Sequence, residues 1–110
     1  MLREPPAVVK LELEHIALEN AHIDTHVHVY REQNVTVDVM AVTRGVPAEV
    51  HERQTQMIHV VAGEGRIETG DRLQDKTRVS PGTVVIIPRG TRHKIVNTGH
   101  SLLRFFTVYC

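Results

Sequence analysis

Hydrophobic and polar residues alternate over most of the chain, in short runs that glycine and proline separate. Every second residue is apolar along Ala7–Leu13, Asp24–Tyr30 and Val35–Val42. Side chains of a β-strand point alternately to its two faces, so this period predicts strands with one buried face. Further strands are expected over residues 49–53 (extended), 56–62, 66–69, 73–79 (an edge strand), 84–87, 93–97 and 102–109.

Helical periodicity is nearly missing from the sequence: one short helical turn is expected at residues 15–21, and Gly45-Val46-Pro47 is expected to break a strand. Eight to ten short strands with such punctuation are typical of a sandwich or barrel, and their number fits a double-stranded β-helix, the jelly-roll barrel. The predicted fold class is therefore all-β. At 110 residues we expect one domain over 7–110, after a flexible arm over 1–6.

Charge and cysteine content narrow the functional classes. Thirteen basic and thirteen acidic side chains cancel, and no basic cluster favours nucleic acid as a partner. No apolar run reaches transmembrane length and residues 1–8 show no signal-peptide pattern, so no membrane partner is expected. The single cysteine, Cys110, suits a reducing, cytoplasmic compartment.

The segment from Gly82 to Asn97 carries the most specific pattern. An apolar β-branched run, Val84–Ile87, is expected to be a buried strand, and Pro88-Arg89-Gly90-Thr91 a tight turn. The chain then returns as a second strand, on which His93 shares a face with Ile95 and Asn97. Taken alone, this is a buried hairpin with a core histidine.

The spacing resembles the second motif of the cupin superfamily, in which glycine, proline, glycine, histidine and asparagine recur at fixed intervals. Here these places hold Gly82, Pro88, Gly90, His93 and Asn97. The first cupin motif, two histidines, a glutamate and a glycine, is similar to Glu49, His51, Gln56 and Gly63, with two ligand types changed. The first cupin motif usually has a glycine six residues before its first ligand, but here that position holds Thr43.

Within the superfamily, the chain resembles small single-domain cupins described as mannose-6-phosphate-isomerase-like, over about 35–109 and more loosely from residue 7. The resemblance implies a pocket inside the barrel, with Glu49, His51, Gln56 and His93 as metal ligands. Two imidazoles, a carboxylate and an amide oxygen favour a divalent transition metal: Zn, Mn, Fe or Ni. The alternative is a polar pocket closed by hydrogen bonds.

Other polar residues lie outside this set and are further candidates. His26 and His28 share a face and can chelate a metal with Asp24, but a polar outer face or a dimer surface is the favoured interpretation. His59 should point away from the site. Arg53 and Tyr30 are candidate substrate-binding residues at the pocket mouth. The aromatic residues near the C-terminal end are expected to serve packing: Phe105, Phe106 and Tyr109.

Together these features predict a metalloprotein that binds or acts on a small polar molecule such as a sugar or sugar phosphate. A metal-dependent isomerase-like or dioxygenase-like enzyme, a ligand-binding or sensor module without turnover, and a structural dimerisation unit remain alternatives. No general base stands out beyond the ligands, so no catalytic residue is assigned. A homodimer that uses the strand at Ala7–Leu13 is expected, because a free edge strand needs cover.

Overall fold

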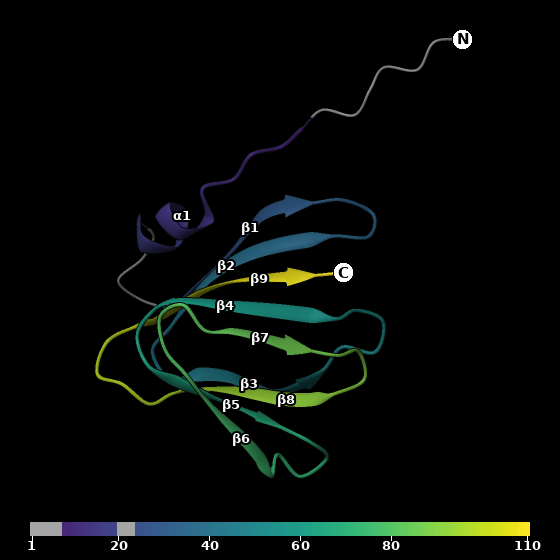
Figure 1. Ribbon diagram of the computed structural model, residues 1–110, viewed down its shortest axis with the longest axis vertical. Coiled ribbons are helices and arrows are strands. Elements are labelled where there is room, and N and C mark those ends of the chain that lie inside the picture. Colours follow the sequence, from purple (N-terminus) through teal and green to yellow (C-terminus); the bar gives the residue numbers. More distant parts are fainter. Residues whose placement is uncertain (1–7, 20–23) are drawn as a thin grey trace.

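The computed structural model describes residues 8–19 and 24–110, which form one helix and two antiparallel β-sheets (Figure 1). The expected all-β class is confirmed. In chain order the elements are α1 (Leu13–Glu19), β1 (Thr25–Arg31), β2 (Thr36–Val42), β3 (Gly45–Val50), β4 (Gln56–Ala62), β5 (Gly65–Thr69), β6 (Asp75–Val79), β7 (Val84–Ile87), β8 (Arg92–Asn97) and β9 (Leu103–Tyr109).

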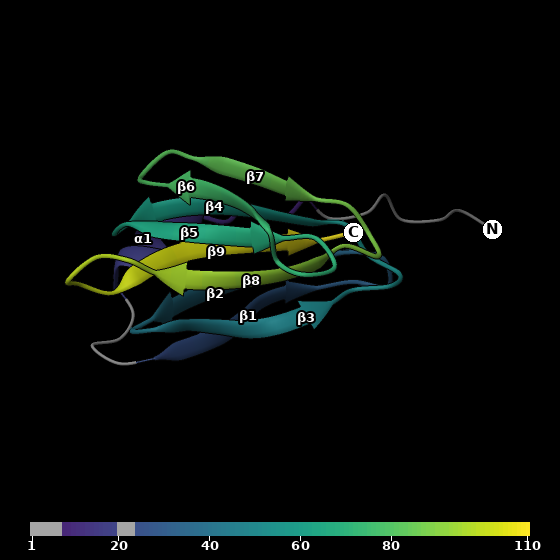
Figure 2. The same cartoon turned by 90° about the horizontal axis from the view of Figure 1, so that it is seen from below.

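The strands form two sheets, and the chain crosses several times from one sheet to the other. One sheet has five strands in the order β1-β2-β9-β4-β7, and the other has four in the order β3-β8-β5-β6. Figure 1 shows the two sets one below the other, and Figure 2 shows that their strands run along roughly one direction. Because β3 pairs with β8, Glu49 lies directly opposite His93.

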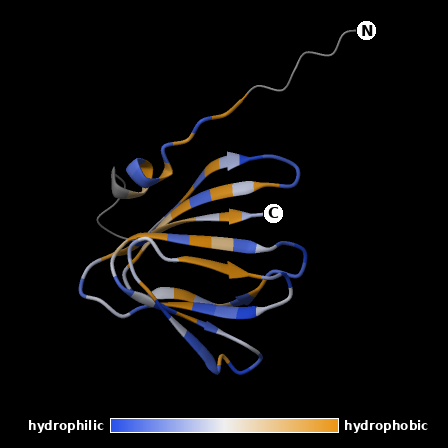
Figure 3. Ribbon diagram, viewed as in Figure 1, coloured by the Kyte–Doolittle hydropathy of each residue, from blue (hydrophilic) through white to orange (hydrophobic). Residues whose placement is uncertain are grey.

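The core lies between the two sheets and is made by the alternation seen in the sequence. Ile58, Ile67, Ile95, Leu103 and Phe105 are all at most 2% exposed. Figure 3 shows the alternation as orange and blue bands along the strands. Removing such side chains from water is the main favourable term in folding, so these positions hold the strands that carry the polar residues described below.

The N-terminal segment differs from the prediction. Residues 8–12 have no regular structure, and α1 begins at Leu13, so the strand expected over Ala7–Leu13 is wrong for the described residues. Leu13, Ile16 and Ala17 follow helical spacing, and α1 packs against β2, β4 and β9. The expected arm over 1–6 lies outside the described residues. No helix in the described part of the chain is long and apolar enough to cross a membrane.

The strand β7 has the predicted bounds but not the predicted burial. It is the last strand of its sheet, so only one of its faces is covered. Ile87 is buried, whereas Val84 and Ile86 are about half exposed, at 48% and 58%. A short apolar run does not reveal whether a strand is central or at an edge. The weaker run at 73–79 gives β6, which is an edge strand as expected.

β2 ends at Val42, before Gly45 as the sequence suggested, but Gly45 and Pro47 themselves lie within the next strand, β3. A Cβ atom at Gly45 would overlap the carbonyl oxygen of Ile95, and the φ angle of Gly45 is +148°. Glycine therefore lets β3 approach β8 closely. A register shift between Val46 and Glu49 accommodates the proline, and the strand continues to the residues of the candidate site.

Candidate metal centre

Three strands deliver the four predicted ligands to one end of the two sheets. Glu49 lies near the end of β3 and His51 just after it, Gln56 begins β4, and His93 is the second residue of β8. One ligand atom each from Glu49, His51 and His93 lies within 4.8 Å of the others. The structure thus brings His93 to Glu49 and His51, which lie far from it in the sequence.

The spacing of these three groups suits a metal better than it suits hydrogen bonds. Glu49 Oε1 lies 3.3 Å from His51 Nε2 and 3.5 Å from His93 Nε2. Both imidazole nitrogens are buried and have no hydrogen-bond partner among the described residues. Metal–ligand bonds of about 2.0–2.2 Å place neighbouring ligand atoms about 3.0–3.5 Å apart, in octahedral or tetrahedral arrangements.

His93 is held in one orientation by the turn before it. The backbone nitrogen of Thr91 donates to the carbonyl oxygen of Pro88 at 3.2 Å, which closes the predicted turn. The Nδ1 atom of His93 lies 2.9 Å from the carbonyl oxygen of Thr91 and can only donate to it. In a neutral ring Nε2 then carries the lone pair, and the side chain is 1% exposed. Such a second hydrogen bond is typical of metal-binding histidines.

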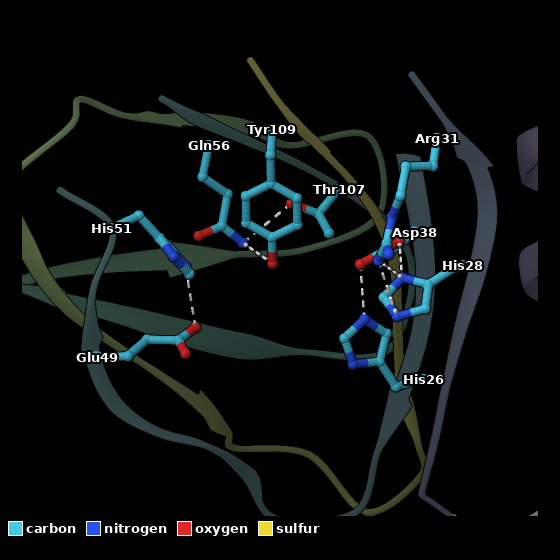
Figure 4. A network of polar contacts seen from close by, with 9 residues as sticks. All are labelled: His26, His28, Arg31, Asp38, Glu49, His51, Gln56, Thr107 and Tyr109. Carbon is cyan, nitrogen blue, oxygen red and sulfur yellow. Dashed lines mark hydrogen bonds and ion pairs between the residues drawn. The ribbon is translucent and has the colours of Figure 1, made fainter. Parts of the chain in front are cut away.

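Gln56 presents its amide oxygen to the same region. Its Nε2 atom donates to Thr107 Oγ1 at 2.9 Å and to the Tyr109 hydroxyl at 3.3 Å. These bonds orient the amide, and Figure 4 shows its oxygen turned toward His51. That oxygen is buried without a hydrogen-bond partner in the described part of the chain, so it fits a fourth ligand.

The sequence suggested that Tyr109 serves packing alone, but this residue also belongs to the site. Its ring lies edge-on to that of His51, with centroids 5.1 Å apart. Burial, followed by the carboxylates of Glu49 and Asp38, raises the pKa of Tyr109 to about 12, and a hydrogen bond with Thr107 opposes this. Tyr109 is therefore a neutral phenol that lies near two carboxylates, those of Glu49 and Asp38.

A cavity of about 340 Å³ lies in front of the site. His26 and His28 line it, together with Arg31, so the expected polar outer face for these histidines is wrong. A dimer surface at these histidines stays a prediction. Their shared partner is Asp38 of β2, not Asp24, which instead accepts hydrogen bonds from Thr43. The remaining lining residues are Thr36, Asp38, Met40, Val46, Glu49, His51, Gln54, Gln56, Ile95 and Tyr109.

Neither candidate substrate-binding residue lines this cavity. The Tyr30 hydroxyl donates to the Glu32 carboxylate at 2.8 Å, and this hydrogen bond raises the pKa of Tyr30. Arg53 is exposed and lines a neighbouring surface depression, together with His51. His59 points away from the site as predicted and contacts Phe106, with ring centroids 4.5 Å apart.

Comparison with known proteins places the chain in a family. The family described as Cupin domain (Cupin_2) matches residues 35–109, so the chain belongs to the cupin superfamily. Protein YrkC of Bacillus subtilis is 26% identical over 78 residues, which cover 68% of this chain and 42% of YrkC. The chain spans about half the length or less of the curated relatives it matches.

Solved structures show the same fold. The crystal structure of BH2720 from Bacillus halodurans has a TM-score of 0.84 and 24% identity, and covers 94% of this chain and 81% of BH2720. An RmlC-like cupin with a double-stranded β-helix fold, from Methanocaldococcus jannaschii, has a TM-score of 0.71 and 17% identity, with 98% and 91% covered. At these identities the likeness establishes the double-stranded β-helix fold and nothing about the reaction.

Proposed function

We propose that this cupin binds a divalent transition metal through Glu49, His51, Gln56 and His93. One observation carries the proposal: three buried ligand-type atoms, His51 Nε2, His93 Nε2 and Gln56 Oε1, have no hydrogen-bond partner in the described residues. Leaving such atoms unsatisfied costs free energy, so a bound ion accounts for them. The carboxylate of Glu49 supplies the negative charge that attracts a dication.

The donor set narrows the choice of metal. Two imidazole nitrogens, a carboxylate and an amide oxygen favour Zn, Mn, Fe or Ni over Ca or Mg. When bound, such an ion supplies Lewis acidity toward the oxygen atoms of a ligand. The chain itself orients His93 through Thr91 and Gln56 through Thr107. The cavity beside Glu49 gives a small molecule access to this place.

The ligand in this proposal is a small polar molecule such as a sugar or sugar phosphate, as in the mannose-6-phosphate-isomerase-like cupins that the sequence resembles. The cavity supports this class through its size, about 340 Å³, and its hydrogen-bonding groups, which include Thr36, Gln54 and Tyr109. A thermal-shift screen of zinc-loaded protein against sugars, sugar phosphates and apolar molecules of equal size tests it. Stabilisation by the apolar molecules alone would contradict the polar class.

A second candidate, a metal-dependent oxygenase, rests on the same three residues. Two histidines and one carboxylate with open positions form the ligand set of many non-haem iron oxygenases, and His51, His93 and Glu49 match it. Oxygen uptake by iron-loaded protein in the presence of each ligand found in the screen separates the two. Binding without turnover or oxygen uptake would identify a ligand-binding or sensor protein.

The homodimer and the cytoplasmic location stay proposals. The strand expected to carry the dimer does not form over residues 8–12. The free edges of the sheets still support dimerisation. β1 and β7 end one sheet and β3 and β6 end the other, and a second copy can pair with or cover such an edge. Light scattering at micromolar concentration tests the assembly, and a monomer under these conditions would contradict it.

A further inference from the structure

The polar groups on the wall opposite the candidate metal ligands form a second cluster. His28 lies directly across from Asp38 in the β1–β2 pair, and His26 lies two residues earlier on the same strand. His26 Nε2 is 2.7 Å from Asp38 Oδ2, and His28 Nδ1 is 2.7 Å from Asp38 Oδ1. Figure 4 shows this cluster and the pair Glu49–His51 on opposite sides of the cavity, with Gln56 and Tyr109 between them.

The distances distinguish the second cluster from the first. A separation of 2.7 Å is that of a charge-assisted hydrogen bond, and it is shorter than the 3.3 and 3.5 Å found around Glu49. The carboxylate of Asp38 is 2% exposed, so both of its oxygens need donors. The two imidazoles therefore donate an N–H each to Asp38.

This bonding fixes which ring atoms face a ligand. With Nε2–H of His26 and Nδ1–H of His28 directed at Asp38, each neutral ring keeps one lone pair, on Nδ1 of His26 and on Nε2 of His28. The two side chains are 45% and 55% exposed, and both line the cavity. The lone pair on Nδ1 of His26 can accept a hydrogen bond from a hydroxyl group, whereas Nε2 of His28 accepts from the guanidinium of Arg31, 3.4 Å away.

Arg31 adds a positive charge at the same wall. Its Nη2 atom lies 3.4 Å from both ring nitrogens of His28, and it is the one lysine or arginine among the described residues that line the cavity. A guanidinium is a strong partner for carboxylate or phosphate. A dication bound at Glu49 and the guanidinium of Arg31 together carry three positive charges, and the carboxylates of Glu49 and Asp38 carry two negative charges. The site then has one net positive charge, which favours an anionic ligand.

From these observations we infer that His26, His28 and Arg31 form the ligand-recognition wall of the cavity, and that its ligand is a small hydroxylated anion. Arg31 pairs with the acidic group, His26 accepts a hydrogen bond from a hydroxyl group, and His28 positions Arg31. Asp38 holds both imidazoles in place. This inference rests on the proposed function, because the remaining oxygens of the ligand face the metal ligands. The acidic group is a carboxylate or a phosphate.

Three probes that differ only in this group test the inference: glycerol, glycerate and glycerol 3-phosphate. Calorimetric titration of zinc-loaded protein should show that at least one anion binds about tenfold or more tightly than glycerol, as expected for a charge-assisted contact. The stronger of the two anions identifies carboxylate or phosphate. Equal binding of all three probes, or binding of none, would overturn the inference.

Variants separate the roles within the wall. Arg31→Ala should remove the preference for the anions, because the exposed arginine contributes charge and not folding. His26→Ala should weaken all three probes, glycerol included. Arg78→Ala, on the exposed face of β6, and His59→Ala, which lies outside the cavity, are the matched controls and should leave binding unchanged. An anion preference that persists in Arg31→Ala would overturn the assignment.

Zinc uptake is measured on the same samples before the probes are added. A protein that takes up no zinc contradicts the proposed function, whereas one that takes up zinc but shows no preference for anions contradicts this inference alone. The wall variants should bind zinc as the wild type does, since none of their residues is among the proposed ligands.

Discussion

The Nδ1 atom of His93 lies 2.9 Å from the carbonyl oxygen of Thr91, two residues earlier in the chain. The hydrogen bond fixes the ring before any ligand binds and leaves the buried Nε2 atom directed at Glu49, 3.5 Å away. A pre-oriented imidazole loses little conformational freedom on binding an ion, and imidazole is the strongest ligand type in the set.

We therefore expect His93→Ala to abolish zinc binding, with a loss of affinity of about 100-fold or more, and His51→Ala to have nearly the same effect. Competition with a chromogenic chelator measures both. His59→Ala removes an imidazole that packs on Phe106 outside the site and serves as the control. Wild-type affinity in the His93→Ala protein would exclude this residue as a ligand.

Changes at Gln56 should alter metal affinity in opposite directions. Gln56→Ala should weaken zinc binding by less than about tenfold, because water can replace a neutral amide oxygen. Gln56→Glu should strengthen binding, because it adds a charge, and the hydroxyls of Thr107 and Tyr109 can donate to the new carboxylate. Gln54→Ala, in the same cavity, is the control. Weaker binding by the glutamate variant would argue against a ligand at this position.

Tyr109 should ionise late. Its pKa is raised to about 12 by burial and by two carboxylates, against about 10 in the unfolded chain. Because the folded pKa is the higher one, the associated stability is fully present below about pH 10 and is lost as the pH rises toward about 12.

The chain has two tyrosines, so a Tyr30→Phe variant leaves Tyr109 as the only phenol. Phenolate absorbance of the metal-free variant, recorded together with circular dichroism, follows ionisation and folding in the same sample. A midpoint near pH 10 while the protein is still folded would be inconsistent with the buried environment described here.

Gly45 should tolerate no side chain, because it brings β3 against β8. Gly45→Ala places a Cβ atom on the carbonyl oxygen of Ile95, in a backbone conformation that favours glycine, and should cost about 3 kcal/mol or more in free energy of unfolding. Gly82→Ala is the control: it also has positive φ, but nothing lies within 4 Å, so a cost of about 1 kcal/mol is expected. Denaturant unfolding measures both, and equal costs would contradict the close approach.

The sequence predicts the strands well where alternation is long and bounded by turns. The bounds of β4 and β7 agree with the prediction, and His59 lies on the face expected from its position. Where apolar residues satisfy two periods, the prediction fails: residues 8–12 form no strand, and Leu13, assigned to that strand, begins the helix that packs against a sheet. A local pattern contains no information about which partner surface is available.

The sequence likewise indicates some residues of the candidate site and not others. The resemblance to the two cupin motifs indicates a shared site for Glu49, His51 and His93 before any coordinates. Parity alone places only Glu49 and His51 on one strand face. Asp38 was missed as the partner of His26 and His28, since their contact depends on the register between β1 and β2 and on a shift in that register after His28. An acidic residue in the middle of an apolar strand was the available signal.

The metal content of protein purified without an affinity tag tests the central claim most directly. Elemental analysis should find about one equivalent of a divalent transition metal per chain in the wild type, and less than about a tenth in the His51→Ala/His93→Ala protein, because a single site needs both imidazoles. Circular dichroism confirms that the variant is folded. An unchanged metal content in this double variant would contradict the assignment of Glu49, His51, Gln56 and His93 as the metal site.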